Sequence, residues 1–331
     1  MNQRLTIFFS IALGLILMGI WLYIVDLSEM IAIIKKVKVA GFLPLAIMFA
    51  LVYFVRSVRW KVILSPIQKI SFSEAFNLCM TNYFVNFLIP IHAGEVARVM
   101  CLKKMKGTPA SKSLLTIYVD KLTDTFPIIL LLAATPFLSK ELNGIIFWTS
   151  GMLSLIVVFI TLCLVFVAYK KETAIKWIEN ILFFMPAKFK MKLKNVLSHF
   201  VEGMRSMTKL SGRLLEIIGL TVLELTIHGM IVWLLFSYFG IRLPVLTVMV
   251  GYLLLCVSLM LPAPPGFVGT MELSFVFIFT YLFGYDKNVV SAVAASAHIF
   301  TAVMFSLLGF MSITLIGTKL TTIFKMESEE A

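Results

Sequence analysis

The sequence has little charge. Only 14% of its 331 residues are Asp, Glu, Lys or Arg, whereas 60% are apolar and the mean hydropathy is +0.99. Soluble domains are closer to half apolar and a quarter charged. Apolar runs at residues 5–25 and 289–316 reach the ~20 residues that a membrane-spanning helix needs. The composition therefore excludes an ordinary soluble protein and predicts an all-α, polytopic membrane protein.

The sequence also lacks the motifs of soluble enzymes. It contains no Gly-x-Gly-x-x-Gly, Walker, Gly-x-Ser-x-Gly or His-Glu-x-x-His pattern. Its four cysteines form no Cys-x-x-Cys pair, so neither a zinc site nor a disulfide framework is indicated. No predicted extramembrane stretch exceeds about 45 residues, which is short for a catalytic domain. We therefore expect no cofactor and no metal, and favour a transporter over an enzyme.

The net charge of +12 does not indicate nucleic-acid binding. Ten of the 29 Lys and Arg residues lie within 170–213, beside predicted spans. Such clusters set the orientation of membrane proteins and attract anionic lipid head groups. We expect a multi-pass protein of the cell (cytoplasmic or inner) membrane with both termini cytoplasmic, and no nucleic-acid partner. The first apolar run is read as a retained helix, because no small-x-small cleavage site closes it.

The hydropathy pattern predicts a single transmembrane domain, 1–331, with an inverted repeat. We expect six full spans, at about 5–25, 40–58, 112–136, 145–168, 213–239 and 288–317. The end of the second span, with Arg56, Arg59 and Trp60, is interpreted as lying at the inner interface. Two opposed re-entrant helical hairpins are expected at about 74–106 and 245–284, because a first hairpin keeps the cations of residues 98–112 on the inner side. Eight plain spans are the alternative. The domain divides into a first half 1–169, a basic cytoplasmic segment 170–212, a second half 213–318 and a tail 319–331.

Both predicted hairpins are interrupted by helix breakers. Breaks at membrane depth survive only where protein or water surrounds them, and paired breaks in two halves of a protein point to a transport site. We predict that the helix breakers gate the site: Pro90 and Gly94 in the first hairpin, and Pro262, Pro265 and Gly266 in the second. A carboxylate follows each break, Glu95 in the first hairpin and Glu272 in the second, and we predict that both bind the substrate.

Charged side chains within membrane segments usually pair or serve a function. Asp120 and Asp124 share a helical face, with Lys121 beside them. The cluster is either a neutral structural clasp or a site for a lipid head group or proton. Glu95 and Arg98 lie three apart, either as a phosphate site or as an ordinary helix start.

Other polar residues carry open alternatives. Asn86 lies four residues after Asn82 and either bridges to a neighbouring helix or faces a cavity. Glu224 and His228 share a helical face and form either a proton relay or a buried clasp. His298 stands alone among small residues and is interpreted as structural.

The order of these motifs resembles the lysylphosphatidylglycerol synthase transmembrane region, a flippase-like family. The resemblance rests on Asn86 to Pro90, Gly94-Glu95 with Arg98, Asp120-Lys121 with Asp124, and Pro262 to Gly266 with Glu272. The chain departs from the family pattern at Asp120-Lys121, where Glu-Arg is usual, and we expect it to act without the soluble aminoacyl-transferring domain of the bifunctional relatives.

The resemblance implies a lipid translocase. Its substrate would be an anionic phospholipid, an aminoacylated phospholipid or a polyprenyl-phosphate-linked sugar, bound by Asn86, Glu95, Arg98, Asp120, Lys121, Asp124 and Glu272. One alternative is the membrane part of a phosphatidylglycerol lysyltransferase or another lipid-modifying transferase, acting with a separate catalytic partner. Another is a non-transporting accessory protein. A homo-oligomer and a separate synthase or glycosyltransferase remain open as partners.

Overall fold

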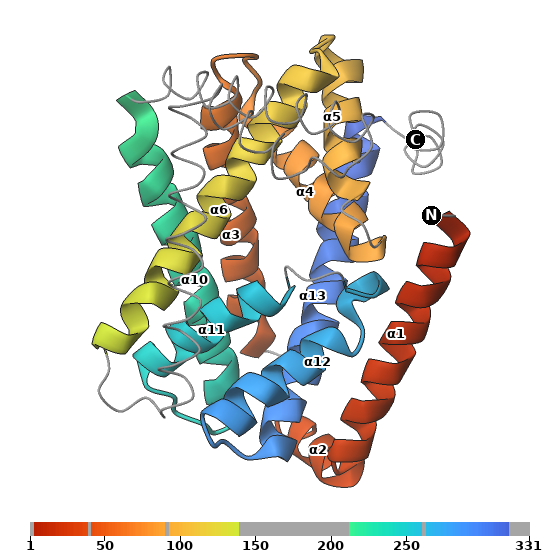
Figure 1. Ribbon diagram of the computed structural model, residues 1–331, viewed down its shortest axis with the longest axis vertical. Helices are drawn as coiled ribbons and strands as arrows, with labels where there is room; N and C mark the ends of the chain where they lie inside the picture. The colour runs from red at the N-terminus through yellow and green to blue at the C-terminus, as the bar shows by residue number, and fades with distance from the viewer. Residues whose placement is uncertain (1–2, 39–40, 90–92, 139–211, 260–262, 318–331) are drawn as a thin grey trace, which may run out of the picture.

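The computed structural model describes residues 3–38, 41–89, 93–138, 212–259 and 263–317. All regular elements in these ranges are helical, which confirms the predicted all-α class. Figure 1 shows the long helices running along the long axis, with shorter helices at both ends. The predicted span 145–168, residues 170–211 of the basic segment and the tail 319–331 lie outside the described residues.

The long helices agree closely with the predicted spans. Three of them are long and apolar enough to cross a membrane: α3 (Phe42–Leu64), α10 (Leu214–Tyr238) and α13 (Lys287–Ile316). A fourth span results if the bent pair α1 (Gln3–Ile24) and α2 (Leu27–Ile34) counts as one. The choice between six spans with hairpins and eight plain spans stays open.

Two segments differ from their predicted structure. The segment after α1 was expected to be a loop, but it contains α2. The chain bends by 88° between the two helices, where the Asp26 carboxylate accepts hydrogen bonds from the backbone N–H groups of Ser28 and Glu29. The second span was expected to end at about residue 58, but α3 continues to Leu64 and buries Arg59 and Trp60.

The first predicted hairpin consists of α4 (Phe72–Leu88) and α5 (Ala93–Lys106). A capping box between Ser71 and Glu74 starts α4, and the Glu74 carboxylate lies 2.7 Å from the Lys106 ammonium at the end of α5. The two helices therefore run antiparallel, with their outer ends together. They approach so closely that a Cβ atom on Gly94 would lie 2.0 Å from the Asn82 carbonyl oxygen.

The second predicted hairpin is less regular. It begins with α11 (Val245–Leu259) and resumes at the 3₁₀ turn η3 (Pro265–Phe267). It then continues through α12 (Thr270–Phe275) into the π-helix η4 (Val276–Leu282). In Figure 1, α11 and α12 lie toward the opposite end of the molecule from α4 and α5. Re-entrance into a membrane from opposite sides stays a prediction.

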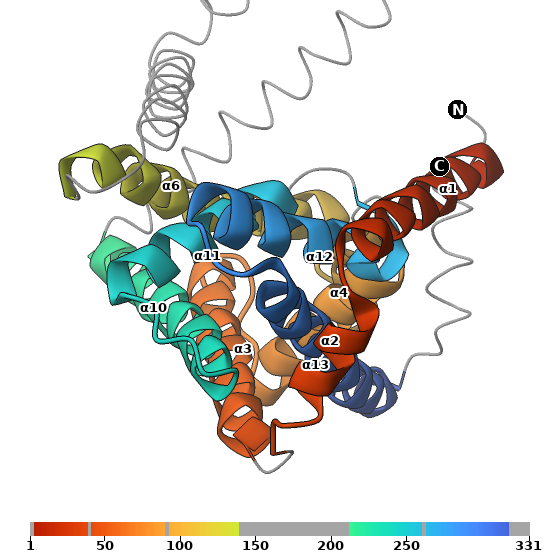
Figure 2. The same cartoon turned by 90° about the horizontal axis from the view of Figure 1, so that it is seen from below.

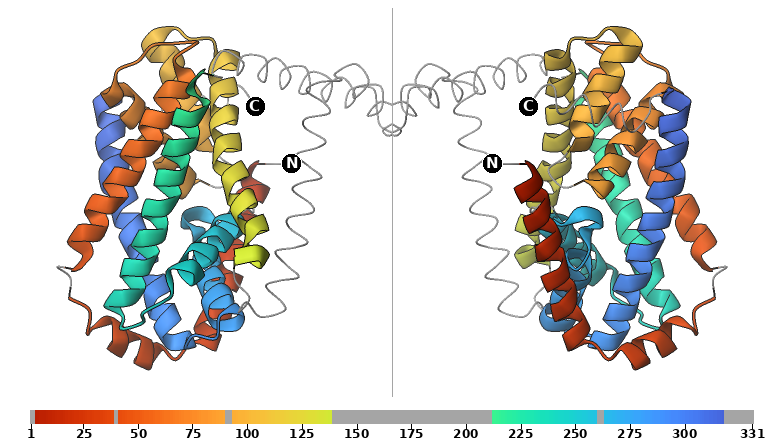
Figure 3. Two further views of the ribbon diagram at one scale, coloured as in Figure 1. Left: turned by 90° about the vertical axis from the view of Figure 1, so that its left-hand side faces the viewer. Right: turned by 90° about the vertical axis from the view of Figure 1, so that its right-hand side faces the viewer.

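The inner ends of the two hairpins meet in the middle of the molecule. The rings of Phe87, at the end of α4, and Phe267 in η3 are 6.4 Å apart. Around this meeting point α13 packs along α4, while α3 packs along α10, as the view from below in Figure 2 and the side views in Figure 3 show. The long helices thus frame the inner ends of both hairpins.

Candidate functional site: a buried arginine–carboxylate network

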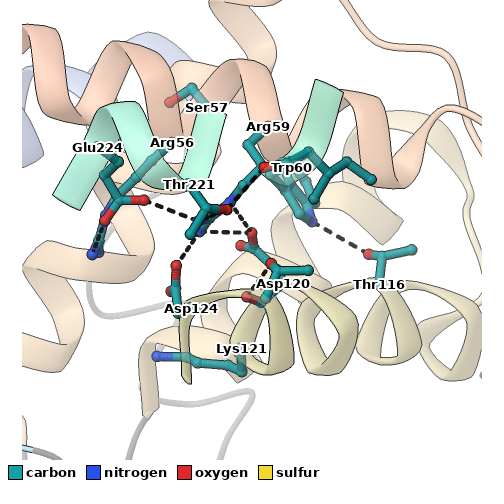
Figure 4. Close-up of polar contacts among 12 residues, drawn as sticks. Arg56, Ser57, Arg59, Trp60, Thr116, Asp120, Lys121, Asp124, Thr221 and Glu224 are labelled. Carbon is teal, nitrogen blue, oxygen red and sulfur yellow. Dashed lines mark hydrogen bonds and ion pairs between the residues drawn. The ribbon is translucent and has the colours of Figure 1, made fainter. Parts of the chain in front are cut away.

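Arg59 of α3 is the centre of a buried polar network. Its side chain is 0% exposed, and its Nη2 lies 3.1 Å from Oδ1 of Asp120. Nη2 also contacts the Asp124 carboxylate, while Nη1 lies 3.0 Å from Oε2 of Glu224. A further hydrogen bond of 3.0 Å runs from Nη1 to the Thr221 hydroxyl. Figure 4 shows these groups converging on one guanidinium.

Arg56 lies one helical turn before Arg59 and shares the Glu224 carboxylate. Its Nε donates a hydrogen bond of 2.6 Å to Oε1 of Glu224. Its guanidinium also lies 4.9 Å from the centre of the Tyr83 ring, within cation–π range. Glu224 therefore connects two arginines, which compensate for the cost of burying its charge.

Helical spacing on three elements brings these groups together. Arg56 and Arg59 lie three residues apart on α3, and Asp120 and Asp124 lie four apart on α6 (Ala110–Leu138). Side chains three or four residues apart share a helical face. Thr221 and Glu224 lie three apart on α10, so each of the three helices turns one polar stripe toward the other two.

Arg98 of α5 extends the network toward the first hairpin. Its Nη1 lies 3.4 Å from Oδ2 of Asp120, and its guanidinium stacks 3.6 Å from the centre of the Trp60 ring. The Trp60 ring is fixed in turn by a hydrogen bond from its Nε1 to the Thr116 hydroxyl. Arg98 is 2% exposed, yet its Nε and Nη2 have no hydrogen-bond partner within the described ranges. Two donors of a buried guanidinium are thus unused there.

Glu95, also on α5, lies in a second cluster at the edge of the network. The Lys121 ammonium is 3.0 Å from its carboxylate, and the Asn86 amide donates to both carboxylate oxygens at 3.1 Å. The side-chain oxygen Oδ1 of Asn86 accepts a hydrogen bond of 2.7 Å from the backbone N–H of Gly94. That N–H is therefore used inside the hairpin. Lys121 is the accessible member of the cluster, with 44% of its side chain exposed.

Among the residues that the structure describes, the charges of the two clusters balance. Three arginines and one lysine face four carboxylates, which is the composition expected of a charged cluster that survives burial. The cations are Arg56, Arg59, Arg98 and Lys121, and the anions are Glu95, Asp120, Asp124 and Glu224.

Arg56 and Arg59 were not among the residues that we predicted from the sequence to form the site. Together with Trp60, these arginines have the pattern of a span end at the inner interface, where cations surround an aromatic residue, and we interpreted them as interfacial. The structure corrects this, because Arg59 and Trp60 are both fully buried against α6 and α10. The signal in the sequence was the arginine spacing of three, which places both side chains on one face of α3, as the spacing of four does for the two acidic residues on α6.

The imidazole of His228 is too far from the Glu224 carboxylate for a hydrogen bond. The Nδ1 atom of His228 is 3.9 Å from the Glu224 carboxylate, and the imidazole stacks on the Tyr252 ring at 5.2 Å. Glu224 is held by the two arginines of α3 instead. The geometry thus places Glu224 in the network and leaves His228 beside it.

Glu272 lies apart from the network, at the inner end of the second hairpin. It pairs there with His298 of α13 and caps the start of α12 through the backbone N–H of Gly269. Gly266, predicted as a gating residue, adopts a left-handed conformation (φ 66°), and its carbonyl oxygen accepts a hydrogen bond from the His298 imidazole. Pro265 begins η3, whereas Pro90 and Pro262 lie outside the described residues.

Metal-ligating side chains do not gather in either region. Within the described ranges, no group of three or more His, Cys, Asp or Glu residues has a geometry suited to a metal ion. The carboxylates of the network face arginines rather than one another. The chemistry that the network offers is recognition of charge.

Comparison with known proteins agrees with the resemblance seen in the sequence. Residues 7–309 match the family described as Lysylphosphatidylglycerol synthase TM region. A UPF0104 membrane protein of Methanothermobacter thermautotrophicus is 21% identical over 321 residues, covering 93% of this chain and 95% of the relative. No solved structure matches the chain significantly. The chain is therefore a multi-pass membrane protein that belongs to the lysylphosphatidylglycerol synthase transmembrane region family.

Proposed function

We propose that this protein is a lipid translocase that moves a lipid with an anionic head group between the leaflets of a cytoplasmic membrane. Candidate substrates are an anionic phospholipid, an aminoacylated phospholipid and a polyprenyl-phosphate-linked sugar. Family membership supports a lipid-related role. The observation that carries the proposal is Arg98, a buried arginine whose Nε and Nη2 have no partner within the described ranges.

Arg98 has the chemistry that a lipid phosphate requires. A guanidinium is always charged, and its planar fork of N–H donors matches two phosphate oxygens. Stacking on Trp60 fixes the plane of that fork. A phosphate bound by Nε and Nη2 would leave the Nη1 contact with Asp120 in place. In this proposal Arg98 grips the phosphate, and Asp120 and Arg59 hold Arg98 in position.

Lys121 provides the entrance to this site. Its ammonium is the accessible cation of the two clusters, and its contact with Glu95 lies at the edge of the first hairpin. An arriving phosphate would compete with Glu95 for Lys121 before it reaches Arg98. The acyl chains would stay in the lipid phase while the head group crosses between the two hairpins, whose inner ends meet at Phe87 and Phe267.

The test is lipid scrambling in proteoliposomes of the full chain with a panel of labelled lipids. Arg98→Ala removes the phosphate donors, and Lys103→Ala, an exposed cation on the same helix, is the matched control. A hydrogen bond to a charged group contributes about 1.5–3 kcal/mol, so Arg98→Ala should weaken head-group binding about tenfold to a hundredfold. Asp124→Asn should also slow scrambling.

The outcomes separate the proposal from its alternatives. Scrambling that is lost in Arg98→Ala and kept in Lys103→Ala supports the head-group site. Equal scrambling by both variants would contradict the assignment of Arg98. If the folded wild-type chain moves no lipid in the panel, the protein is not the translocase proposed here. Stable co-purification with a synthase or glycosyltransferase would then indicate the accessory role.

A further inference from the structure

Glu272 and His298 form a second buried polar unit that the head-group site does not use. The Nδ1 atom of His298 lies 2.5 Å from Oε1 of Glu272, and Nε2 lies 2.6 Å from the Gly266 carbonyl oxygen. The other carboxylate oxygen accepts the backbone N–H of Gly269 at 2.9 Å. Glu272 is 3% exposed. Every polar atom of both side chains is thus engaged.

Counting donors and acceptors fixes the number of protons in this unit. A carbonyl oxygen only accepts, so Nε2 of His298 must carry a hydrogen. The 2.5 Å contact between Nδ1 and Oε1 requires a second hydrogen, because two facing lone pairs would repel at that distance. This hydrogen sits either on an imidazolium beside a carboxylate or on a neutral carboxyl group beside a neutral imidazole. In both forms the unit is neutral and holds one proton that can leave.

We infer that Glu272 and His298 together form a proton-binding site, and that lipid movement is coupled to the loading and release of this proton. The coupling part of the inference rests on the proposed translocase function. On release the N–H or O–H bond breaks, its electron pair stays on that nitrogen or oxygen, and the proton passes to water on the open side. No oxidation or reduction takes place.

Release of the proton would break the contact that holds the hairpin. A deprotonated pair carries one uncompensated negative charge, which is costly away from water. The pair must then separate or become hydrated, and His298 loses its attachment to Glu272. Phe267 beside Gly266 already adopts a left-handed backbone, which only surrounding contacts can maintain.

This contact lies where it can affect both hairpins. His298 belongs to α13, and Gly266 belongs to the turn whose neighbour Phe267 faces Phe87 of α4. The His298 ring also lies edge-on to the Phe87 ring, with centroids 6.3 Å apart. Loss of the proton would therefore loosen the second hairpin where it touches the first.

The elements around the pair supply no competing charge. Residues 9–24 of α1 contain no charged side chain or histidine, and neither does α11. Glu29 of α2 contacts Asn288, ten residues before His298 and about 15 Å along α13. Among the described residues the charged group that acts on His298 is Glu272.

The remaining titratable groups on neighbouring elements are accounted for. The charges of α3 and α10 in this part of the bundle lie in the arginine network, and α4 carries one charge, Glu74, at its outer end. The neutral titratable side chains are Tyr23 on α1, Cys79 and Tyr83 on α4, Tyr53 on α3, His228 and Tyr238 on α10, Tyr252 and Cys256 on α11, and Tyr281 on η4.

The first arm of the test detects the proton. Histidine side-chain NMR signals of the purified full chain are followed against pH, and the His298 signal is identified by its loss in His298→Gln. We expect this signal to titrate, with a midpoint that shifts in Glu272→Gln and stays in place in Glu216→Gln, an exposed carboxylate control on α10. A signal that does not titrate, or that ignores Glu272→Gln, overturns the proton site.

The second arm detects the coupling. Proteoliposomes are given a pH gradient of one unit while potassium and valinomycin hold the membrane potential at zero. If one proton moves with each lipid, the gradient shifts the distribution of labelled lipid between leaflets by about tenfold, in the direction that distinguishes symport from antiport. Glu272→Gln should abolish the shift, and Glu216→Gln should keep it.

The two arms fail separately. Lipid movement in wild type without any response to the gradient overturns the coupling. Absence of lipid movement in every protein contradicts the proposed translocase function, and the NMR arm still decides whether the pair binds a proton.

Discussion

The arginine network and the Glu272–His298 pair are both buried, yet they differ in whether their charge can be removed. Each cation at the centre of the network is a guanidinium, which keeps its proton at any physiological pH. The pair instead joins an imidazole to a carboxylate, and a single proton decides its charge. The arginine network therefore keeps its charges at physiological pH, whereas the net charge of the Glu272–His298 pair depends on one proton.

The two regions also differ in how many groups each central side chain contacts. Arg59 alone contacts three carboxylates from two other helices, so its loss leaves several charges unpaired. His298 connects one carboxylate and one carbonyl of a single hairpin. We therefore expect changes in the network to affect folding, and changes in the pair to affect motion.

Arg59→Ala should have the largest effect on stability. Removing one partner of a buried ion pair costs about 3–5 kcal/mol, because the remaining charges are left uncompensated. The free energy of unfolding, measured in mixed detergent micelles, should fall by that amount. Lys69→Ala, an exposed cation just beyond the end of α3, is the control and should change it by less than about 0.5 kcal/mol. Equal stability of both variants would show that the network is not structural.

Gly94→Ala should have the next largest effect on the free energy of unfolding. Its Cβ atom would lie 2.0 Å from the Asn82 carbonyl oxygen, so α4 and α5 must move apart, at a cost of about 1–3 kcal/mol. Gly219→Ala on α10 is the matched control, because no atom lies within 4 Å of its added methyl group. That control should be neutral or stabilising by up to about 1 kcal/mol. Wild-type stability for Gly94→Ala would mean that the hairpin is packed less closely than described.

Glu272→Gln tests whether the Glu272–His298 pair contributes less to stability than the arginine network does. The amide still accepts the Gly269 N–H, and the imidazole becomes neutral, so no isolated charge remains buried. We expect a loss of about 1–2 kcal/mol, because a hydrogen bond to a charged group, which contributes about 1.5–3 kcal/mol, is replaced by a weaker one to a neutral amide. The same unfolding measurement applies. A loss as large as that of Arg59→Ala would contradict the distinction between a fixed and a removable charge.

Glu74→Gln should have the smallest effect. The Glu74–Lys106 pair at the outer end of the first hairpin is partly exposed, and such pairs contribute about 0.2–1 kcal/mol. The hydrogen bond from Lys106 lowers the pKa of the Glu74 carboxyl below its usual value. The stabilisation is therefore present above the ordinary glutamate pKa of about 4.3 and is lost as pH falls through the lowered value. Unfolding measured between pH 7 and pH 3 should show this loss in wild type and not in Glu74→Gln.

The sequence was sufficient for the class of protein and for many members of the site. Low charge and long apolar runs specify helical spans, because hydrocarbon leaves backbone groups no partner outside the helix. Breakers at Pro90 and Gly94 marked the boundary between α4 and α5. Charges that are costly within a membrane segment singled out Arg98, Asp120, Asp124 and Glu224, which the structure brings into one network; their role in binding stays a prediction.

The tertiary structure decided which groups meet. Arg59 reads from the sequence as an interfacial cation, and only the packing of α6 and α10 against α3 makes it the buried centre of the network. His298 reads as a structural residue until the turn at Gly266 brings Glu272, 26 residues away in sequence, against its ring. Local spacing specifies which residues share a helical face, whereas the partner of that face depends on contacts between segments distant in sequence, which spacing alone does not contain.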